Sequence, residues 1–160
     1  MQWQQFAAEA PELARLGHER LQGPGIAFIG TLRRDGSPRI TPVEPYFVGD
    51  ELMVGMMWQS RKALDLIRDP RVAVHSATTD KEGVEGDFKL YGRAVLREDP
   101  EARLGYADET FARINWRPAE PYHLFAIDVE SAGYVIFGDN RFGLAWQAGA
   151  PARRFDLAQP

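Results

Sequence analysis

The chain has 160 residues, of which 44% are hydrophobic and 26% charged, as is typical of a single globular domain with its own core. A net charge of −4 gives no general attraction to nucleic acid or to an anionic membrane, so we expect neither as a partner. The absence of cysteine excludes disulfides and thiolate chemistry. With no secretory signal and no long apolar run, we expect a soluble, cytoplasmic protein.

Residues 1–22 are predicted to be helical. Apolar side chains recur at roughly helical spacing from Trp3 to Leu21, and Pro11 is expected to break the segment or to begin its second half. Gly23-Pro24-Gly25 then ends the helical segment.

From Ile26 the pattern becomes that of β-strands joined by tight turns. Asp35-Gly36 and Gly49-Asp50 each separate two β-rich runs, which is typical of hairpins. Pro42 and Pro45 fall inside the second run and cannot donate to a strand ladder. We therefore predict that this strand lies at an edge, contains a bulge, or faces a ligand.

The rest of the chain predicts two further helices among strands. Ser60 is a candidate N-cap for a short helix with an apolar stripe of Ala63, Leu64 and Ile67, which Asp69-Pro70 ends. The strands expected next are 71–77 and 87–97, followed by a helix over 100–115 with the apolar face Leu104, Ala107, Phe111 and Ile114. A strand pair over 123–130 and 132–138 and an irregular tail over 138–160 complete the chain. About seven antiparallel strands with three helices predict a mainly β (α+β) domain, a closed or partly closed barrel with helices outside.

The residues Ser60-Arg61-Lys62 form a candidate phosphate site. A helix N-terminus offers unpaired N–H groups, and cations in a first helical turn are unfavourable unless an anion lies nearby. The alternative, a helix cap followed by two solvated basic residues, is equally open at this point.

Three further groups are candidates for a binding site. Alternation along a strand would place Arg39, Thr41 and Val43 on one face, although Arg39 alone is as readily a surface residue beside the hairpin. Met56-Met57-Trp58 offers a soft, flat wall for an aromatic ring, or simply core filler. Trp146 is expected either to cover a pocket, which could belong to a neighbouring subunit, or to anchor the tail.

Motifs for the common catalytic classes are missing from the sequence. It has no HExxH, GxSxG or GxxxxGK[ST] pattern, which argues against a metal hydrolase, a serine hydrolase and a P-loop enzyme. We therefore assign no catalytic residue.

Three segments carry a family resemblance: TLRRDGSPRITPV, ELMVGMMWQSRKALDLIRDPRVAVHS and DFKLYGRAVL. With them the chain resembles the pyridoxamine 5′-phosphate oxidase-like, FMN-binding split-barrel superfamily over roughly residues 22–137. The resemblance implies a six-stranded antiparallel Greek-key barrel that forms a homodimer with two cofactors at the interface. It also implies a set of cofactor contacts: the phosphate would be held by Ser60 and Lys62 with help from Arg61, the isoalloxazine lined by Arg39, Thr41, Pro42 and Val43, backbone contacts made by Met57 and Trp58, and Trp146 contributed by the other subunit.

The sequence also departs from that family. It lacks the longer basic phosphate-binding strand and the terminal Arg-x-His pattern of true pyridoxamine phosphate oxidases, so vitamin B6 oxidation is not expected. The chain looks more like the small flavin or deazaflavin reductases and the stress-associated flavin binders.

The resulting hypothesis is an FMN-dependent oxidoreductase that transfers hydride or electrons to a small molecule. One alternative is a reductase that uses the deazaflavin coenzyme, whose acidic tail Arg33, Arg34, Arg39 and Arg61 could bind. Another is a non-catalytic flavin or haem binder, with His75 or His123 as the haem ligand. The last alternative is a structural barrel that binds no cofactor.

Overall fold

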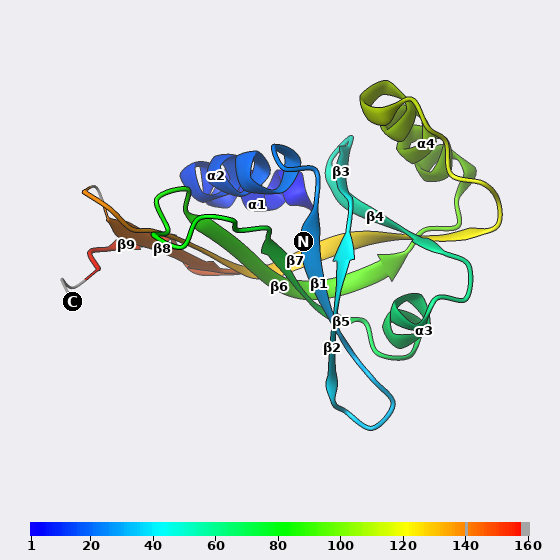
Figure 1. Ribbon diagram of the computed structural model, residues 1–160, viewed down its shortest axis with the longest axis horizontal. Helices are drawn as coiled ribbons and strands as arrows, with labels where there is room; N and C mark the ends of the chain where they lie inside the picture. Colours follow the sequence, from blue (N-terminus) through cyan, green and yellow to red (C-terminus); the bar gives the residue numbers. More distant parts are fainter. Residues whose placement is uncertain (140, 158–160) are drawn as a thin grey trace.

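The structure is a computed structural model that describes residues 1–139 and 141–157. Within those residues, four helices surround a nine-stranded antiparallel sheet (Figure 1). The elements are α1 (Trp3–Glu9), α2 (Pro11–Gln22), β1 (Ala27–Leu32), β2 (Pro38–Val43), β3 (Pro45–Val48), β4 (Glu51–Met57), α3 (Arg61–Arg68), β5 (Arg71–Ser76), β6 (Asp87–Leu96), α4 (Pro100–Ile114), β7 (Tyr122–Ile136), β8 (Phe142–Gln147) and β9 (Arg153–Phe155).

The sheet has the strand order β2-β1-β5-β6-β7-β4-β3, and β8 and β9 extend from β7. The pairs β1–β5 and β4–β7 join strands that are not consecutive in the chain, as in a Greek key. β2 and β3 stand at the two ends of the order although only Glu44 separates them in sequence. The sheet is therefore an antiparallel barrel that stays split between these strands, and the predicted mainly β fold with flanking helices is confirmed.

The structure has nine strands where six were expected. The predicted run 39–48 is divided at Glu44 into two edge strands, which confirms the edge position inferred from Pro42 and Pro45. The predicted irregular tail is wrong between 142 and 155, because it contains β8 and β9. Residues 140 and 158–160 of that tail lie outside the described part of the chain.

The strand pair predicted over 123–130 and 132–138 is a single strand, β7. Its partner β6 pairs Tyr91 with Ser131 but Gly92 with Val129, so Glu130 is an extra residue that forms a β-bulge. A Cβ atom at Gly92 would overlap the carbonyl oxygen of Asp128, so glycine is required there. The bulge bends the strand where the sequence pattern suggested a turn.

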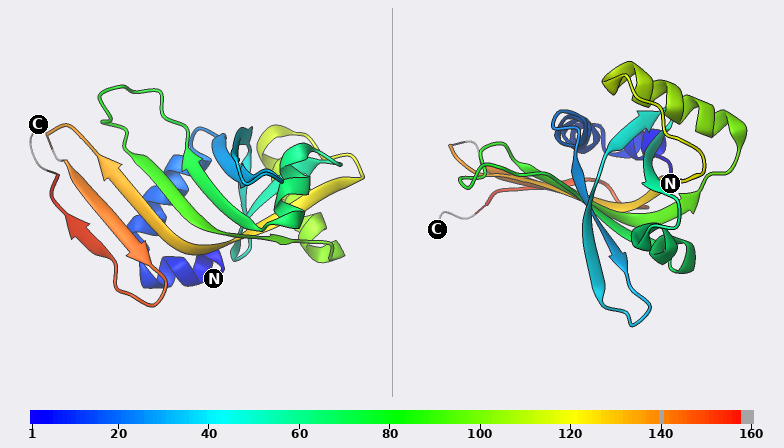
Figure 2. Two further views of the ribbon diagram at one scale, coloured as in Figure 1. Left: turned by 90° about the horizontal axis from the view of Figure 1, so that it is seen from below. Right: turned by 45° about the vertical axis from the view of Figure 1, so that its right-hand side comes forward.

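Helices α1 and α2 cover one face of the sheet over β6, β7 and β8 (Figures 1 and 2). They are separated at Ala10, directly before Pro11, as the sequence predicted. Phe6 and Leu13 are fully buried in the main core together with Phe88 of β6. This face of the sheet is thus closed by the N-terminal segment.

The predicted apolar face of α4 is wrong. Leu104, Phe111 and Ile114 are 61%, 47% and 51% exposed. The helix instead buries Tyr106, whose ring packs edge-on against Tyr46 of β3 at 5.3 Å. Tyr106 is buried in place of the aliphatic stripe because the sheet offers other tyrosine rings against which it packs. No helix among the described residues is long and apolar enough to span a membrane.

Candidate functional site

The seam between β2 and the start of α3 gathers most of the predicted site residues. The Lys62 Nζ donates a hydrogen bond to the carbonyl oxygen of Pro42 at 2.7 Å. Arg39 Nε donates to Asp65 Oδ2, also at 2.7 Å. Arg39 therefore points toward α3 and is not a free surface residue. The predicted alternation is confirmed, since Arg39, Thr41 and Val43 are less exposed than Ile40 and Pro42.

Asp65 is a site residue that the sequence pattern missed. Its side chain is 5% exposed and accepts hydrogen bonds from Thr31 Oγ1 at 3.0 Å and Arg68 at 3.2 Å, besides the one from Arg39. Burial raises the pKa of Asp65, but the hydrogen bonds from Arg39, Thr31 and Arg68 outweigh burial and hold that pKa below its usual range. Asp65 is thus a buried anion that orients two arginines.

The buried face of α3 accounts for the omission. The predicted stripe is correct at Ala63 but wrong at Leu64 and Ile67, which are 40% and 49% exposed. Asp65 and Leu66 take their places in the interface. The available signal was Arg39, because a guanidinium on the inward face of a strand requires an acidic partner.

Two hydroxyl groups at the seam have no partner. Within residues 1–139 and 141–157, Thr41 Oγ1 and Ser60 Oγ are buried and make no hydrogen bond. Ser60 occupies the N-cap position of α3, yet its side chain makes no capping bond. Buried hydroxyls are almost always satisfied in native proteins, so this pair matches a polar ligand at the seam.

The end of β4 supplies a flat wall beside the seam. Gln59 has a left-handed φ of 57°, and this tight turn, with the Ser60 N–H donating to the Met57 carbonyl at 3.1 Å, directs the chain into α3. Trp58 is 52% exposed and stacks on His123 of β7, with ring centroids 4.3 Å apart and planes at 15°. Met57 is 78% exposed, whereas Met56 belongs to the core. Met57 and Trp58 are therefore available for contact, and Met56 is filler.

The charges around the seam are mostly positive. Burial lowers the pKa of Lys62, an effect that the nearby Glu44 carboxylate opposes. Next to it lies an open groove of about 530 Å³, which we call the arginine groove, lined mainly by basic side chains. They are Arg33, Arg34, Arg39, Arg61 and Arg68.

Trp146 lies away from this seam. It belongs to β8, at the opposite end of the molecule from α3 (Figure 1). Its side chain is 3% exposed, packs on Phe6 with ring centroids 4.8 Å apart, and anchors the C-terminal segment as one alternative predicted. The indole Nε1 is buried with no partner among the described residues.

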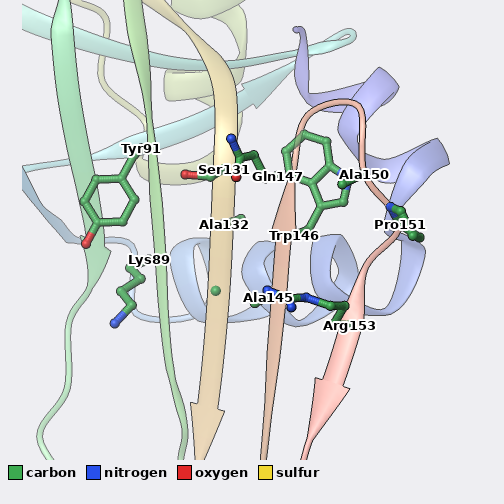
Figure 3. A pocket seen from close by; sticks show the side chains of 11 residues that line it. Lys89, Tyr91, Ser131, Ala132, Ala145, Trp146, Gln147, Ala150, Pro151 and Arg153 are labelled. Carbon is green, nitrogen blue, oxygen red and sulfur yellow. The ribbon is translucent and has the colours of Figure 1, made fainter.

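A cavity of about 470 Å³ lies along the strand that carries Trp146. Its lining includes Lys89 of β6, Ser131 of β7, Gln147 of β8 and Arg153 of β9, whose side chains Figure 3 shows. The lining is mostly apolar, with two cations, Lys89 and Arg153, among it. We call it the distal cavity.

The two histidines considered for haem are both engaged. His75 Nδ1 lies 2.8 Å from the Ser76 carbonyl oxygen. The ring of His123 is covered by Trp58, and burial, with Arg103 nearby, lowers the pKa of His123. The described residues also contain no group of three side chains that could hold a metal ion.

Residues 17–136 match the family model described as pyridoxamine 5′-phosphate oxidase. The match covers most of the chain and includes the seam, the wall and α3. An antiparallel split barrel of this type defines the class of protein. The chain belongs to the pyridoxamine 5′-phosphate oxidase-like family. Comparison with curated proteins by sequence finds no significant match.

Solved structures share the fold. A pyridoxamine 5′-phosphate oxidase-related, FMN-binding protein from Nostoc punctiforme has a TM-score of 0.66 at 15% identity, over 93% of this chain and 96% of that one. PhzG from Burkholderia lata, in complex with tetrahydrophenazine-1-carboxylic acid, has a TM-score of 0.62 at 14% identity, over 95% and 93%. A haem-binding protein from Mycobacterium smegmatis has a TM-score of 0.63 at 16% identity; 82% of this chain matches, spanning 57% of that protein.

Proposed function

We propose that the protein is a homodimeric, FMN-dependent oxidoreductase that binds its cofactor at the seam between β2 and α3. The observation that carries the proposal is the pair of unpartnered hydroxyls, Thr41 and Ser60, beside the cations Arg39 and Lys62. A phosphate supplies acceptor oxygens for every one of these donors. The family match and the similarity in fold to an FMN-binding protein also support FMN as the cofactor.

The residues present fit the phosphate end of FMN. Lys62 would leave the Pro42 carbonyl or share its protons with the phosphate, and the N-terminus of α3 favours an anion at the same place. The exposed Arg61 would add a second cation. Met57 and Trp58 would contact the ring system, while Val43, whose side chain is buried, would contribute backbone only.

FMN would supply the hydride or electron chemistry, and the protein would supply position and electrostatics. Asp65 holds Arg39 in one orientation, so the guanidinium is already placed when the cofactor binds. Trp58, fixed by its stack on His123, would exclude water from one side of the ring.

The proposed homodimer rests on an apolar outer face. Phe28 of β1, Ile40 of β2 and Tyr91 of β6 lie on one face of the sheet, with β5 between β1 and β6, and are 42%, 72% and 50% exposed. Tyr91 also lines the distal cavity, so the face and that cavity are continuous. A partner on this face would bring its distal cavity, with the strand of Trp146, toward the cofactor.

A titration of the protein with FMN tests the proposal. Lys62→Met should weaken FMN binding by roughly ten- to a hundredfold, because a charge-assisted hydrogen bond is worth about 1.5–3 kcal/mol. Lys81→Met is the matched control, since Lys81 is 90% exposed on the loop between β5 and β6. Equal affinities for wild type and Lys62→Met would contradict the assignment. Tight FMN binding without turnover of any electron acceptor would favour the non-catalytic alternative.

The arginine groove favours one second candidate, a reductase that uses the deazaflavin coenzyme. Five arginines line about 530 Å³, and among the described residues Asp35 and Asp65 are the acidic side chains that share this lining. Such a groove suits an acidic tail that FMN lacks. If this candidate is right, the protein binds the deazaflavin more tightly than FMN, and replacing Arg33 and Arg34 by Gln weakens only the deazaflavin. The opposite preference would reject it.

A further inference from the structure

A concave pocket of about 300 Å³ lies beside the seam, between the end of β4, α4 and the segment 116–122. We call it the aromatic pocket. Four aromatic side chains line it: Trp58, Tyr106, Trp116 and Tyr122. Trp116 is 51% exposed at its mouth, whereas Tyr106 and Tyr122 are buried at 4% and 7%. The pocket is thus a slot with aromatic walls, a buried floor and an exposed rim.

The only charged side chain that lines the aromatic pocket among the described residues is Glu44. Arg103 lies behind Tyr122, 4.1 Å from its ring centroid, and is bound by Glu120 at 2.6 Å, so its charge is already paired on the far side of the ring. Glu44 has no ion pair within 4.0 Å in residues 1–139 and 141–157. An aromatic slot whose lining charge is a carboxylate attracts cations and repels anions, although Lys62 of the neighbouring seam offsets part of that charge.

Tyr106 gives the floor a hydrogen-bond donor. Its hydroxyl oxygen accepts the N–H of Gly55 at 3.1 Å, which leaves the hydroxyl proton free to donate. Burial, with Tyr46 nearby, raises the pKa of Tyr106 well above its usual range, so the proton stays on the oxygen. The pocket therefore offers a donor at its floor, ring faces at its walls and a carboxylate at its rim.

The aromatic pocket shares its wall with the proposed cofactor site. Met57 and Trp58 line it, and Glu44 follows Val43 directly in the chain. A molecule in this slot would lie next to a ring that rests on the same wall.

We propose that the aromatic pocket is the substrate site and that its ligand is a planar aromatic nitrogen compound with a positive charge and no phosphate or carboxylate. That the ligand is a substrate rests on the proposed function, whereas binding itself does not. No cation in the described part of the chain lines the slot to neutralise a phosphate, and the Glu44 carboxylate would repel an anion there. This is a different ligand chemistry from that of the seam, where the cations are.

Calorimetric titration of the cofactor-free full-length protein tests this with three probes of similar size and shape: 1-methylquinolinium, quinoline and 2-naphthoate. We expect the cation to bind tightest and the anion weakest. Glu44→Gln should weaken the cation about fivefold, as for a partly exposed ion pair, and leave quinoline unchanged. Trp116→Ala should weaken both, about tenfold for the cation.

The control variant is Glu101→Gln, which removes an exposed carboxylate from the first turn of α4, outside the aromatic pocket. It should leave all three affinities unchanged. Tighter binding of 2-naphthoate than of the cation, or no effect of Glu44→Gln, would overturn the proposal. FMN titration keeps the two proposals apart. Cation binding without FMN binding rejects the cofactor alone, and FMN binding without cation binding rejects the aromatic pocket alone.

Discussion

Replacing Asp65 by Asn should lower both the stability of the protein and its affinity for FMN. The carboxylate is 5% exposed and receives three hydrogen bonds, two of them from arginines. Breaking a buried ion pair by removing one partner costs about 3–5 kcal/mol, because the other charge is left uncompensated. Arg39 and Arg68 are 19% and 35% exposed and can partly rehydrate, which places the expected loss near the lower end, about 3 kcal/mol.

For a chain of this length that loss corresponds to a fall in Tm of about 6–12 °C. Urea unfolding of wild type, Asp65→Asn, Arg39→Gln and the double variant forms a double-mutant cycle. The double variant should lose at least about 1 kcal/mol less than the sum of the single losses, since neither charge is then left unpaired. A loss under about 1 kcal/mol for Asp65→Asn, or strictly additive losses, would refute the reasoning.

The same variant carries a pH signature. Because the folded-state pKa of Asp65 is lowered, its stabilising contribution is fully present above its usual pKa of about 4 and is lost as pH falls through the lowered value. The stability gap between wild type and Asp65→Asn should therefore be constant near pH 7 and shrink below pH 4. A gap that widens in acid would show that Asp65 is not held as an anion.

Two further predictions concern the sheet and the wall. In urea unfolding, Gly92→Ala should destabilise the protein by about 3 kcal/mol, because the added Cβ would overlap the Asp128 carbonyl oxygen. Gly30→Ala is the control and should change stability by less than about 1 kcal/mol, because its Cβ would lie 3.5 Å from the nearest side chain. Burial lowers the pKa of His123, so the contribution of the neutral ring to the stability of the fold is present above pH 6.5 and is lost as pH falls below that value. Wild type should therefore lose more stability between pH 7.5 and 5.5 than His123→Phe. Equal losses would contradict the assignment.

Local signals in the sequence were sufficient for several element boundaries in the first half of the chain. Pro11, Asp35-Gly36, Gly49-Asp50 and Asp69-Pro70 each mark the boundary that they predict, because backbone restrictions at proline and glycine act within a few residues. The position of Arg39 and Thr41 on one face followed from strand alternation alone.

The remaining features depend on contacts that are distant in sequence. The apolar stripe of α4 gave the wrong buried face because Tyr106 finds Tyr46 across the fold. The continuity of β7 depends on a bulge opposite Gly92, which a single strand's pattern does not contain. Asp65 stands between two leucines in the sequence, where a local pattern gives no reason for an acidic residue on the buried side of a helix. Its pairing with Arg39, which is distant in sequence, supplies that reason.

The two prolines of the second strand connect the fold with the site. Pro42 and Pro45 lie on either side of Glu44, at the point where β2 ends and β3 begins and where the sheet does not close. An edge strand leaves outward carbonyls without ladder partners, and the carbonyl of Pro42 is the one to which Lys62 donates. The seam that offers cations and the aromatic pocket that offers a carboxylate therefore meet at this opening, with Glu44 between them. The proposed cofactor and substrate sites therefore adjoin each other at the point where the sheet is split.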